Sequence, residues 1–149
     1  LLQAAGESGK IVNIKKGQFL SPSEMKYSAE KVAMTGNNKI LLTERGTTFG
    51  YNNLVVDMRS LVIMRESGYP IIFDATHSVQ LPGGGQGVTA GNREFILPLA
   101  RAAVAVGVDG IFLETHPNPQ EAKSDAASQL PLDELENFVK QIIALHNTI

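Results

Sequence analysis

Short apolar runs that end in ionisable residues recur four times along the chain, and this repetition constrains the fold more than any other feature. Each run is bounded by Gly, Pro or charged residues, a pattern typical of buried strands. Stretches with helical features follow the runs. The predicted strands and the groups that follow them are 11–14 with Lys15, 39–43 with Glu44 and Arg45, 71–73 with Asp74 and His77, and 111–113 with Glu114 and His116.

Alternating strands and helices predict an α/β fold with a parallel sheet. A (β/α)8 TIM barrel contains eight strand-helix units in roughly 250 residues. The four units of this 149-residue chain therefore predict half of such a barrel. A small, complete doubly wound sheet is the alternative, but neither common glycine-rich phosphate loop follows a strand.

The segments between and after the strands predict the helices of this fold. The first begins with the capping hydroxyl of Ser21 and the acidic Glu24, which suits the positive end of the helix dipole. The second has an irregular start, and the last has an apolar face of helical spacing. The predicted helices are 21–34, 54–66, 93–106 and 132–146.

Two further stretches carry expectations of their own. Residues 78–92 contain five glycines, which predicts a flexible loop long enough to act as a lid. The chain opens without methionine at Leu1–Ala5, a stretch typical of the last turns of a helix. We therefore expect the sequence to be a fragment of a longer protein.

Composition excludes several classes of function. A net charge of -2 gives no electrostatic case for binding nucleic acid or an anionic membrane. No apolar run reaches membrane-spanning length and no basic-then-apolar leader opens the chain, which predicts a cytoplasmic protein. The chain has no cysteine, so a metal ion would have to be bound by His, Asp or Glu.

Two cations end neighbouring predicted strands. In a barrel, Lys15 and Arg45 would point into the same mouth, where two fixed positive charges suit a phosphate or a carboxylate. The alternative is structural, with Arg45 paired to Glu44 or Asp74 at the barrel rim. Lys16 is expected to be solvated.

One imidazole and two carboxylates form a candidate metal site. His77, Glu114 and Asp125 offer nitrogen and oxygen ligands that suit Mn, Fe or Zn. Their wide separation in sequence matches no short ligand motif, and a single His at a strand end is more often a hydrogen-bonded structural or acid-base residue. His116 is expected to lie beside the ligands.

Seven short segments, spread over nearly the whole chain, form one combined pattern. They are 14–19, 43–46, 49–57, 74–80, 114–117, 124–125 and 129–132. Together they resemble the 3-deoxy-D-manno-octulosonate 8-phosphate synthase family, and they match only the second half of that enzyme. This agrees with the half-barrel inferred from the strand pattern.

The resemblance implies a homotetrameric (β/α)8 enzyme of which residues 1–149 are a single domain, the C-terminal half of the barrel. Its reaction would condense phosphoenolpyruvate with D-arabinose 5-phosphate and release phosphate, on the route to lipopolysaccharide. The stretch 78–92 would be the family's mobile lid, which closes on the substrate.

The resemblance also implies roles for individual residues. Lys15 and Arg45 would bind the phosphate and carboxylate of phosphoenolpyruvate, and Gln80 would belong to the same substrate site. His77 would lie beside that substrate. His77, Lys15 and Asp125 would act in catalysis, with Asp125 near the aldehyde or its water.

A divalent metal ion and no organic cofactor complete the implied site, with His77, Glu114 and Asp125 as ligands. The family has a metal-dependent branch with a cysteine near the amino terminus and a metal-free branch with asparagine there. Segments 43–45 and 124–126 resemble the metal-dependent branch. The cysteine or asparagine position and the family's pentose-phosphate-binding region have no counterpart in these residues.

Three alternatives stay open. The sister family, the 3-deoxy-D-arabino-heptulosonate 7-phosphate synthases, shares several motifs but usually has Asp-Pro-Ser-His at 74–77 and lacks the run 49–57. A metal-assisted hydrolase could use the His77, Glu114 and Asp125 group to activate water. A half-barrel without catalytic activity is the third.

Overall fold

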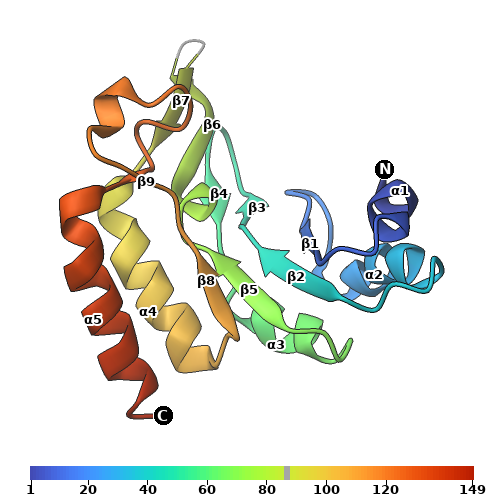
Figure 1. Ribbon diagram of the computed structural model, residues 1–149. Coiled ribbons are helices and arrows are strands. Elements are labelled where there is room, and N and C mark those ends of the chain that lie inside the picture. The colour runs from blue at the N-terminus through green and yellow to red at the C-terminus, as the bar shows by residue number, and fades with distance from the viewer. Residues whose placement is uncertain (86–87) are drawn as a thin grey trace.

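A four-stranded parallel sheet lies at the centre of the structure, a computed structural model that describes residues 1–85 and 88–149 (Figure 1). The strands pair in chain order, β1 (Val12–Lys15), β2 (Ile40–Glu44), β5 (Ile71–Asp74) and β8 (Gly110–Phe112). Right-handed crossovers between strands in chain order place the connecting helices on one face of the sheet. A doubly wound sheet reverses its strand order, so that alternative is wrong.

The helices lie around the outer side of this curved sheet (Figure 1). Because strand and helix alternate and the sheet is parallel, the predicted fold class is confirmed as consecutive units of a (β/α)8 barrel. No helix within the described part of the chain has the length and hydrophobicity needed to cross a bilayer. The helices are α1 (Leu2–Glu7), α2 (Met25–Ala33), α3 (Arg59–Arg65), α4 (Ile96–Val106) and α5 (Leu135–His146), preceded in several cases by a short 3-10 turn.

The core lies between the sheet and these helices. Alternate residues of the strands face the helices and are buried, among them Ile14, Leu42, Ile71 and Phe73. They pack with buried residues of α2, α3 and α4 in one cluster. Burial of each large apolar side chain contributes about 1.5–3 kcal/mol. The opposite face of the strands is therefore left for side chains that take no part in the core.

The predicted helix 54–66 is wrong at its start. Residues Leu54–Val55 form strand β4, which pairs antiparallel with β3 (Thr47–Thr48), and helix α3 begins only at Arg59. The connecting turn contains Asn52 at φ 52°, a left-handed conformation that Asn tolerates well.

The predicted glycine-rich loop is also wrong, because most of it is a β-hairpin. Strand β6 (Gln80–Gly85) pairs antiparallel with β7 (Val88–Gly91), after a 3-10 turn at His77–Val79. The pairing has a register shift between Leu81 and Gly85, and Gly83 has φ +73°. Glycine thus supplies the irregular backbone of a twisted hairpin. Residues 86–87 of the predicted lid lie outside the described residues.

The chain beyond β8 is fastened by one more strand pair. Strand β9 (Thr115–His116) pairs in parallel with β10 (Leu130–Pro131). The backbone N–H of Leu130 also donates to the carbonyl of Glu114, at 3.0 Å. The loop between the two strands, which carries Asp125, is thereby held at the end of β8.

Candidate active site at the carboxyl ends of the strands

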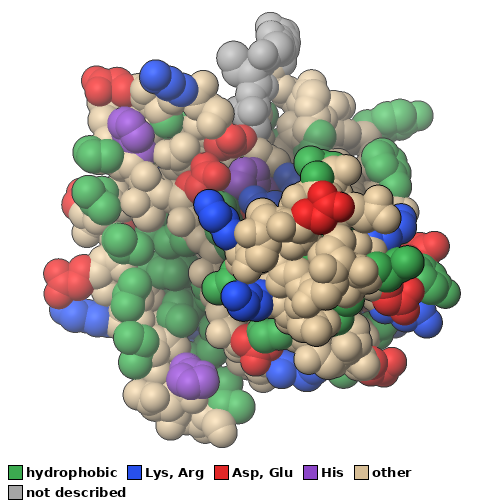
Figure 2. Space-filling view, turned by 45° about the vertical axis from the view of Figure 1, so that its right-hand side comes forward, with side chains coloured by type: hydrophobic (Ala, Val, Ile, Leu, Met, Phe, Trp, Pro, Cys, Tyr) green, Lys and Arg blue, Asp and Glu red, His purple; other side chains and the backbone are tan. Residues whose placement is uncertain are grey.

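Lys15, Asp74 and His77 meet at the carboxyl ends of β1 and β5. Lys15 Nζ lies 2.8 Å from Asp74 Oδ2 and 3.3 Å from His77 Nδ1. Asp74 Oδ2 is also 2.8 Å from His77 Nδ1, and its other oxygen accepts the backbone N–H of His77 at 2.8 Å. These contacts orient the imidazole. In Figure 2, acidic, basic and histidine side chains gather around a hollow of the molecule.

The second nitrogen of His77 faces the candidate metal site. Nε2 lies 3.5 Å from Glu114 Oε1. One ligand atom each of His77, Glu114 and Asp125 lies within 4.8 Å of the others. When Nδ1 donates to Asp74, Nε2 keeps its lone pair, which is the arrangement that metal-binding histidines use. The donor set therefore fits a divalent ion of the Mn, Fe or Zn type.

Gln80 connects Arg45 with Asp125, one of the candidate metal ligands. Arg45 Nη2 donates to Gln80 Oε1 at 2.6 Å and to the carbonyl of His77 at 3.5 Å. Gln80 Nε2 in turn donates to Asp125 Oδ1 at 2.5 Å. Burial lowers the pKa of Arg45, while the charge of Asp74, followed by those of Asp125 and Glu44, raises it. The guanidinium remains protonated because its ordinary pKa is so high.

Asp74 is the buried anion of the site, with a fully buried side chain. Burial alone would raise its pKa, but hydrogen bonds from the His77 side chain and backbone and from Lys15 more than offset that effect. The net result is a pKa below the ordinary value. Asp74 is therefore ionised at neutral pH, and its carboxylate holds the Lys15 ammonium group and the His77 imidazole in place.

A depressed pKa makes Asp74 a source of acid-sensitive stability. Its contribution is present above the unfolded-state pKa, near 4, and is lost as pH falls through the lower folded-state pKa. We expect Asp74→Asn to lower the free energy of unfolding of the full-length protein by about 2 kcal/mol at pH 7. Urea unfolding of both proteins between pH 7 and pH 3 measures this, and the difference should shrink below pH 4.

The exposed carboxylate Asp133 supplies the control for that experiment. Asp133→Asn should leave the free energy of unfolding nearly unchanged at every pH. A difference between Asp74→Asn and wild type that stays constant down to pH 3 would contradict a depressed pKa for Asp74.

Backbone contacts hold the carboxylate loops in place. The N–H of Glu114 donates to Thr76 Oγ1 at 2.7 Å. Gln129 Nε2 donates to the carbonyl of Ser124 at 3.0 Å and lies 3.4 Å from Glu114 Oε2. Asp125 itself has φ 57°, an uncommon left-handed conformation for a non-glycine residue. The backbone around the candidate ligands is thus determined by several independent contacts.

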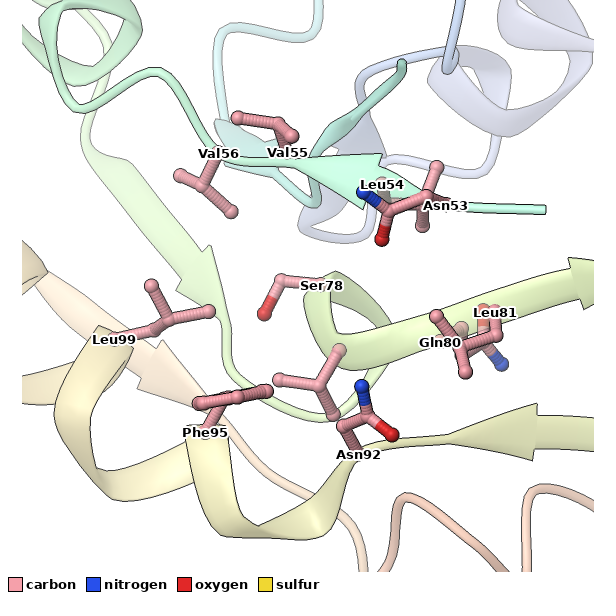
Figure 3. A pocket seen from close by; sticks show the side chains of 11 residues that line it. Asn53, Leu54, Val55, Val56, Ser78, Gln80, Leu81, Asn92, Phe95 and Leu99 are labelled. Atoms are coloured by element: carbon pink, nitrogen blue, oxygen red, sulfur yellow. The ribbon is translucent and has the colours of Figure 1, made fainter. Parts of the chain in front are cut away.

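An apolar cavity of about 260 Å³ lies close to this cluster (Figure 3). Leu54 and Val56 line it from one side, and Phe95, just before α4, and Leu99 of α4 line it from the other. Gln80 is the only one of the residues predicted to bind substrate or metal that contributes to its wall. Among the residues that the structure describes, none that lines this cavity is ionisable, so the predicted chemistry belongs to the neighbouring cluster.

Two predictions about the cations can now be judged. Lys16 is not solvated: it is 1% exposed and its Nζ lies 3.5 Å from Glu44 Oε1. The structural alternative for Arg45 is not observed, because Glu44 pairs with Lys16, and Asp74 with Lys15. Arg45 instead donates to Gln80.

The predicted site residues Lys15, His77, Glu114 and Asp125 thus lie together, and Gln80 brings Arg45 to them. His116 contacts the backbone rather than the predicted ligands: its Nδ1 accepts the N–H of Asn118 at 3.0 Å.

Sequence reasoning missed the roles of Asp74 and Phe112. The sequence predicts Asp74 only as a strand-end residue or a partner of Arg45, yet it orients His77. The ring of Phe112 lies 4.1 Å from Lys15 Nζ, a cation–π contact. Asp74 has a sequence signal, since it directly follows the apolar run 71–73, and the structure pairs it in register with Phe112 of β8.

The chain is similar to known proteins along nearly its whole length. The model of the DAHP synthetase I family matches residues 1–149. Proteins named 2-dehydro-3-deoxyphosphooctonate aldolase are similar to the chain. That of Syntrophotalea carbinolica is 62% identical over 97% of the chain and 52% of the relative, and that of Legionella pneumophila (strain Corby) is 57% identical over 96% and 52%. That of Fusobacterium nucleatum is 56% identical over 100% and 54%.

The chain spans about half the length of the curated relatives it matches. The family model, in contrast, matches the chain from its first residue to its last. The chain therefore belongs to the DAHP synthetase I family.

Proposed function

We propose that the chain is the C-terminal half of a synthase that condenses phosphoenolpyruvate with D-arabinose 5-phosphate to give 3-deoxy-D-manno-octulosonate 8-phosphate and phosphate. The name 2-dehydro-3-deoxyphosphooctonate aldolase, borne by relatives at 54–62% identity, denotes the same enzyme. The observation that carries the proposal is the convergence of Lys15, His77, Glu114 and Asp125, with Arg45 joined through Gln80. On this proposal, residues 1–149 form one domain.

Lys15 and Arg45 supply the positive charge that a substrate with both a phosphate and a carboxylate group needs. Arg45 can bind a phosphate or carboxylate through two parallel N–H groups, and Lys15 acts as a point charge. Both lie near His77, whose Nδ1 is 3.3 Å from Lys15 Nζ and whose carbonyl is 3.5 Å from Arg45 Nη2. Phosphoenolpyruvate bound by the two cations would therefore lie against His77.

His77, Glu114 and Asp125 would hold a divalent metal ion, which supplies Lewis-acid stabilisation of negative charge on oxygen when bound. Asp74 keeps the proton of His77 on Nδ1, so Nε2 stays available. Gln80 donates to Asp125 and limits where its carboxylate can point. Asp125 would also act near the aldehyde or its water.

The reaction joins two carbons and releases phosphate. The C=C electron pair of phosphoenolpyruvate forms a bond from the methylene carbon to the aldehyde carbon, and the aldehyde C=O opens to a hydroxyl. Water adds to the adjacent carbon of phosphoenolpyruvate and gives one proton to that hydroxyl. The bond from this carbon to the phosphate oxygen then breaks, the carbon becomes the ketone of the product, and the second water proton leaves with the phosphate. The cations bind the enol substrate in position, His77 lies against it, and Asp125 is the group placed to move protons.

A homotetramer in the cytoplasm is the remaining part of the proposal. Exposed aromatic side chains in the loop after β1 and in the turn between β3 and β4 support association, because large apolar patches are rarely left in contact with water. Phe19 is 89% exposed, Phe49 69% and Tyr51 99%. The location in the cytoplasm stays a prediction from the sequence.

The alternatives make different chemical demands. A seven-carbon synthase would need the four-carbon aldehyde erythrose 4-phosphate, and a hydrolase would need no aldehyde at all. The relatives at 54–62% identity carry the name of the eight-carbon enzyme, which favours arabinose 5-phosphate. A half-barrel without catalysis would make no use of the clustered ionisable groups.

Phosphate release from phosphoenolpyruvate by the full-length protein tests the proposal. We expect release that depends on arabinose 5-phosphate and falls at least a hundredfold with erythrose 4-phosphate. Release without any sugar would support a hydrolase, and preference for erythrose 4-phosphate would support the seven-carbon synthase. No release under any of these conditions would contradict catalysis altogether.

A further inference from the structure

A buried ion pair lies directly behind the two candidate substrate-binding cations. Lys16 and Glu44 are each 1% exposed, and Lys16 Nζ lies 3.5 Å from Glu44 Oε1. Nothing in the proposed chemistry uses either residue. Two charges rarely lie this deep without a specific partner, because removing them from water is costly.

Strand geometry explains why the pair lies where it does. Successive side chains of a strand point to opposite faces, so Lys16 follows Lys15 on the other face, and Glu44 precedes Arg45 in the same way. The pairing of β1 and β2 aligns Lys15 with Thr43, and the N–H of Lys16 donates to the Thr43 carbonyl at 2.8 Å. The Lys16–Glu44 pair thus links the ends of β1 and β2 on the face opposite to Lys15 and Arg45.

The ammonium group of Lys16 ties together both loops that leave these strands. It donates to the carbonyl of Gly46 at 3.2 Å and to Thr47 Oγ1 at 3.0 Å, both after β2. It also donates to the carbonyl of Gly17 at 3.3 Å, after β1. All the partners lie within three residues of one of the two cations.

Glu44 closes the turn that carries Arg45. Its Oε1 accepts the backbone N–H of Gly46 at 2.6 Å, and its Oε2 accepts the hydroxyl of Ser60 on α3 at 2.6 Å. Gly46 has φ +89°, and an added Cβ would lie 3.3 Å from the side chain of Leu54. Arg45 therefore lies between Glu44, which is fixed by hydrogen bonds, and Gly46, which is fixed by its left-handed backbone conformation.

We propose that Lys16 and Glu44 are positioning residues that set the spacing of Lys15 and Arg45, and so the affinity of the site for phosphoenolpyruvate. The inference rests on the proposed function for the identity of the anion. Stability alone is a weaker explanation, because buried ion pairs can often be replaced by apolar residues without loss of stability. What an apolar pair could not supply is the set of hydrogen bonds to the two loops.

The test compares Lys16→Met and Glu44→Gln in the full-length protein with Lys31→Met, an exposed lysine of α2. We expect the KM for phosphoenolpyruvate to rise at least tenfold in both buried variants. The KM for arabinose 5-phosphate should change less than twofold, and Lys31→Met should match wild type in both. A purely structural role would reduce the active fraction and hence the apparent kcat, and would leave both KM values unchanged.

Unchanged KM for phosphoenolpyruvate in a folded variant would overturn the inference. If Lys16→Met does not fold, Glu44→Gln decides, because the amide keeps the shape of the side chain but removes the negative charge that holds the Lys16 ammonium group against the two loops. If the wild-type protein makes no product, the proposed function fails separately. Calorimetric titration with inorganic phosphate then decides: a tenfold loss of affinity in Glu44→Gln supports the positioning role, and equal affinity overturns it.

Discussion

Replacing His77 with alanine is expected to lower the turnover of the full-length protein at least a hundredfold. The imidazole of His77 contacts Lys15, Asp74 and Glu114. Its Nδ1 lies 2.8 Å from Asp74, and its Nε2 lies 3.5 Å from Glu114 within the candidate metal group. Removing it eliminates one candidate metal ligand and leaves the buried charge of Asp74 with one partner fewer.

Steady-state kinetics and the metal content of the purified protein together measure this effect. We expect His77→Ala to lose bound metal as well as turnover. The matched control is His146→Ala, which removes an exposed imidazole from the last turn of α5 and should leave both quantities unchanged. Turnover of His77→Ala within a few-fold of wild type would contradict the role assigned to this residue.

Replacing Arg45 with alanine is expected to lower kcat/KM for phosphoenolpyruvate about a thousandfold. Truncating one partner of a buried, charge-assisted hydrogen bond costs about 2–5 kcal/mol, and each 1.36 kcal/mol corresponds to a factor of ten. The substitution would also free Gln80 from its 2.6 Å contact with the guanidinium. Because Gln80 donates to Asp125, losing Arg45 should also disturb the position of this candidate metal ligand.

A lysine at the same position separates charge from geometry. Arg45→Lys keeps the positive charge but cannot form two parallel hydrogen bonds, so its kcat/KM should fall between wild type and Arg45→Ala. Arg101→Ala, on the exposed side of α4, is the control and should behave as wild type. If Arg45→Ala and Arg101→Ala gave the same kinetics, Arg45 would not bind the substrate.

The fold could be predicted because both the apolar runs and their alternation with helices follow from the burial of a parallel sheet. A buried parallel strand must be apolar along its length, and the four apolar runs correspond to β1, β2, β5 and β8 within one or two residues. The half-barrel then followed from the number of units. The hairpins β3–β4 and β6–β7 could not be predicted in the same way, since their strands are short or glycine-rich.

The site was predictable at the level of which residues meet, but not of which residues pair. Parallel strands bring their carboxyl ends to one edge, which is why Lys15 and His77 lie within 3.3 Å of each other. Pairing depends on side-chain alternation and burial that a single sequence does not reveal. Lys16 therefore looked solvated although it is buried, and Asp74 proved to orient His77 rather than to bind Arg45.

The most direct test of the account is a crystal structure of the full-length protein with phosphoenolpyruvate bound. The account predicts that the phosphate and carboxylate of the ligand lie within hydrogen-bond distance of both Lys15 and Arg45, with the enol against His77. Phosphoenolpyruvate bound elsewhere, or contacting neither cation, would contradict the claim that these strand ends form one substrate site.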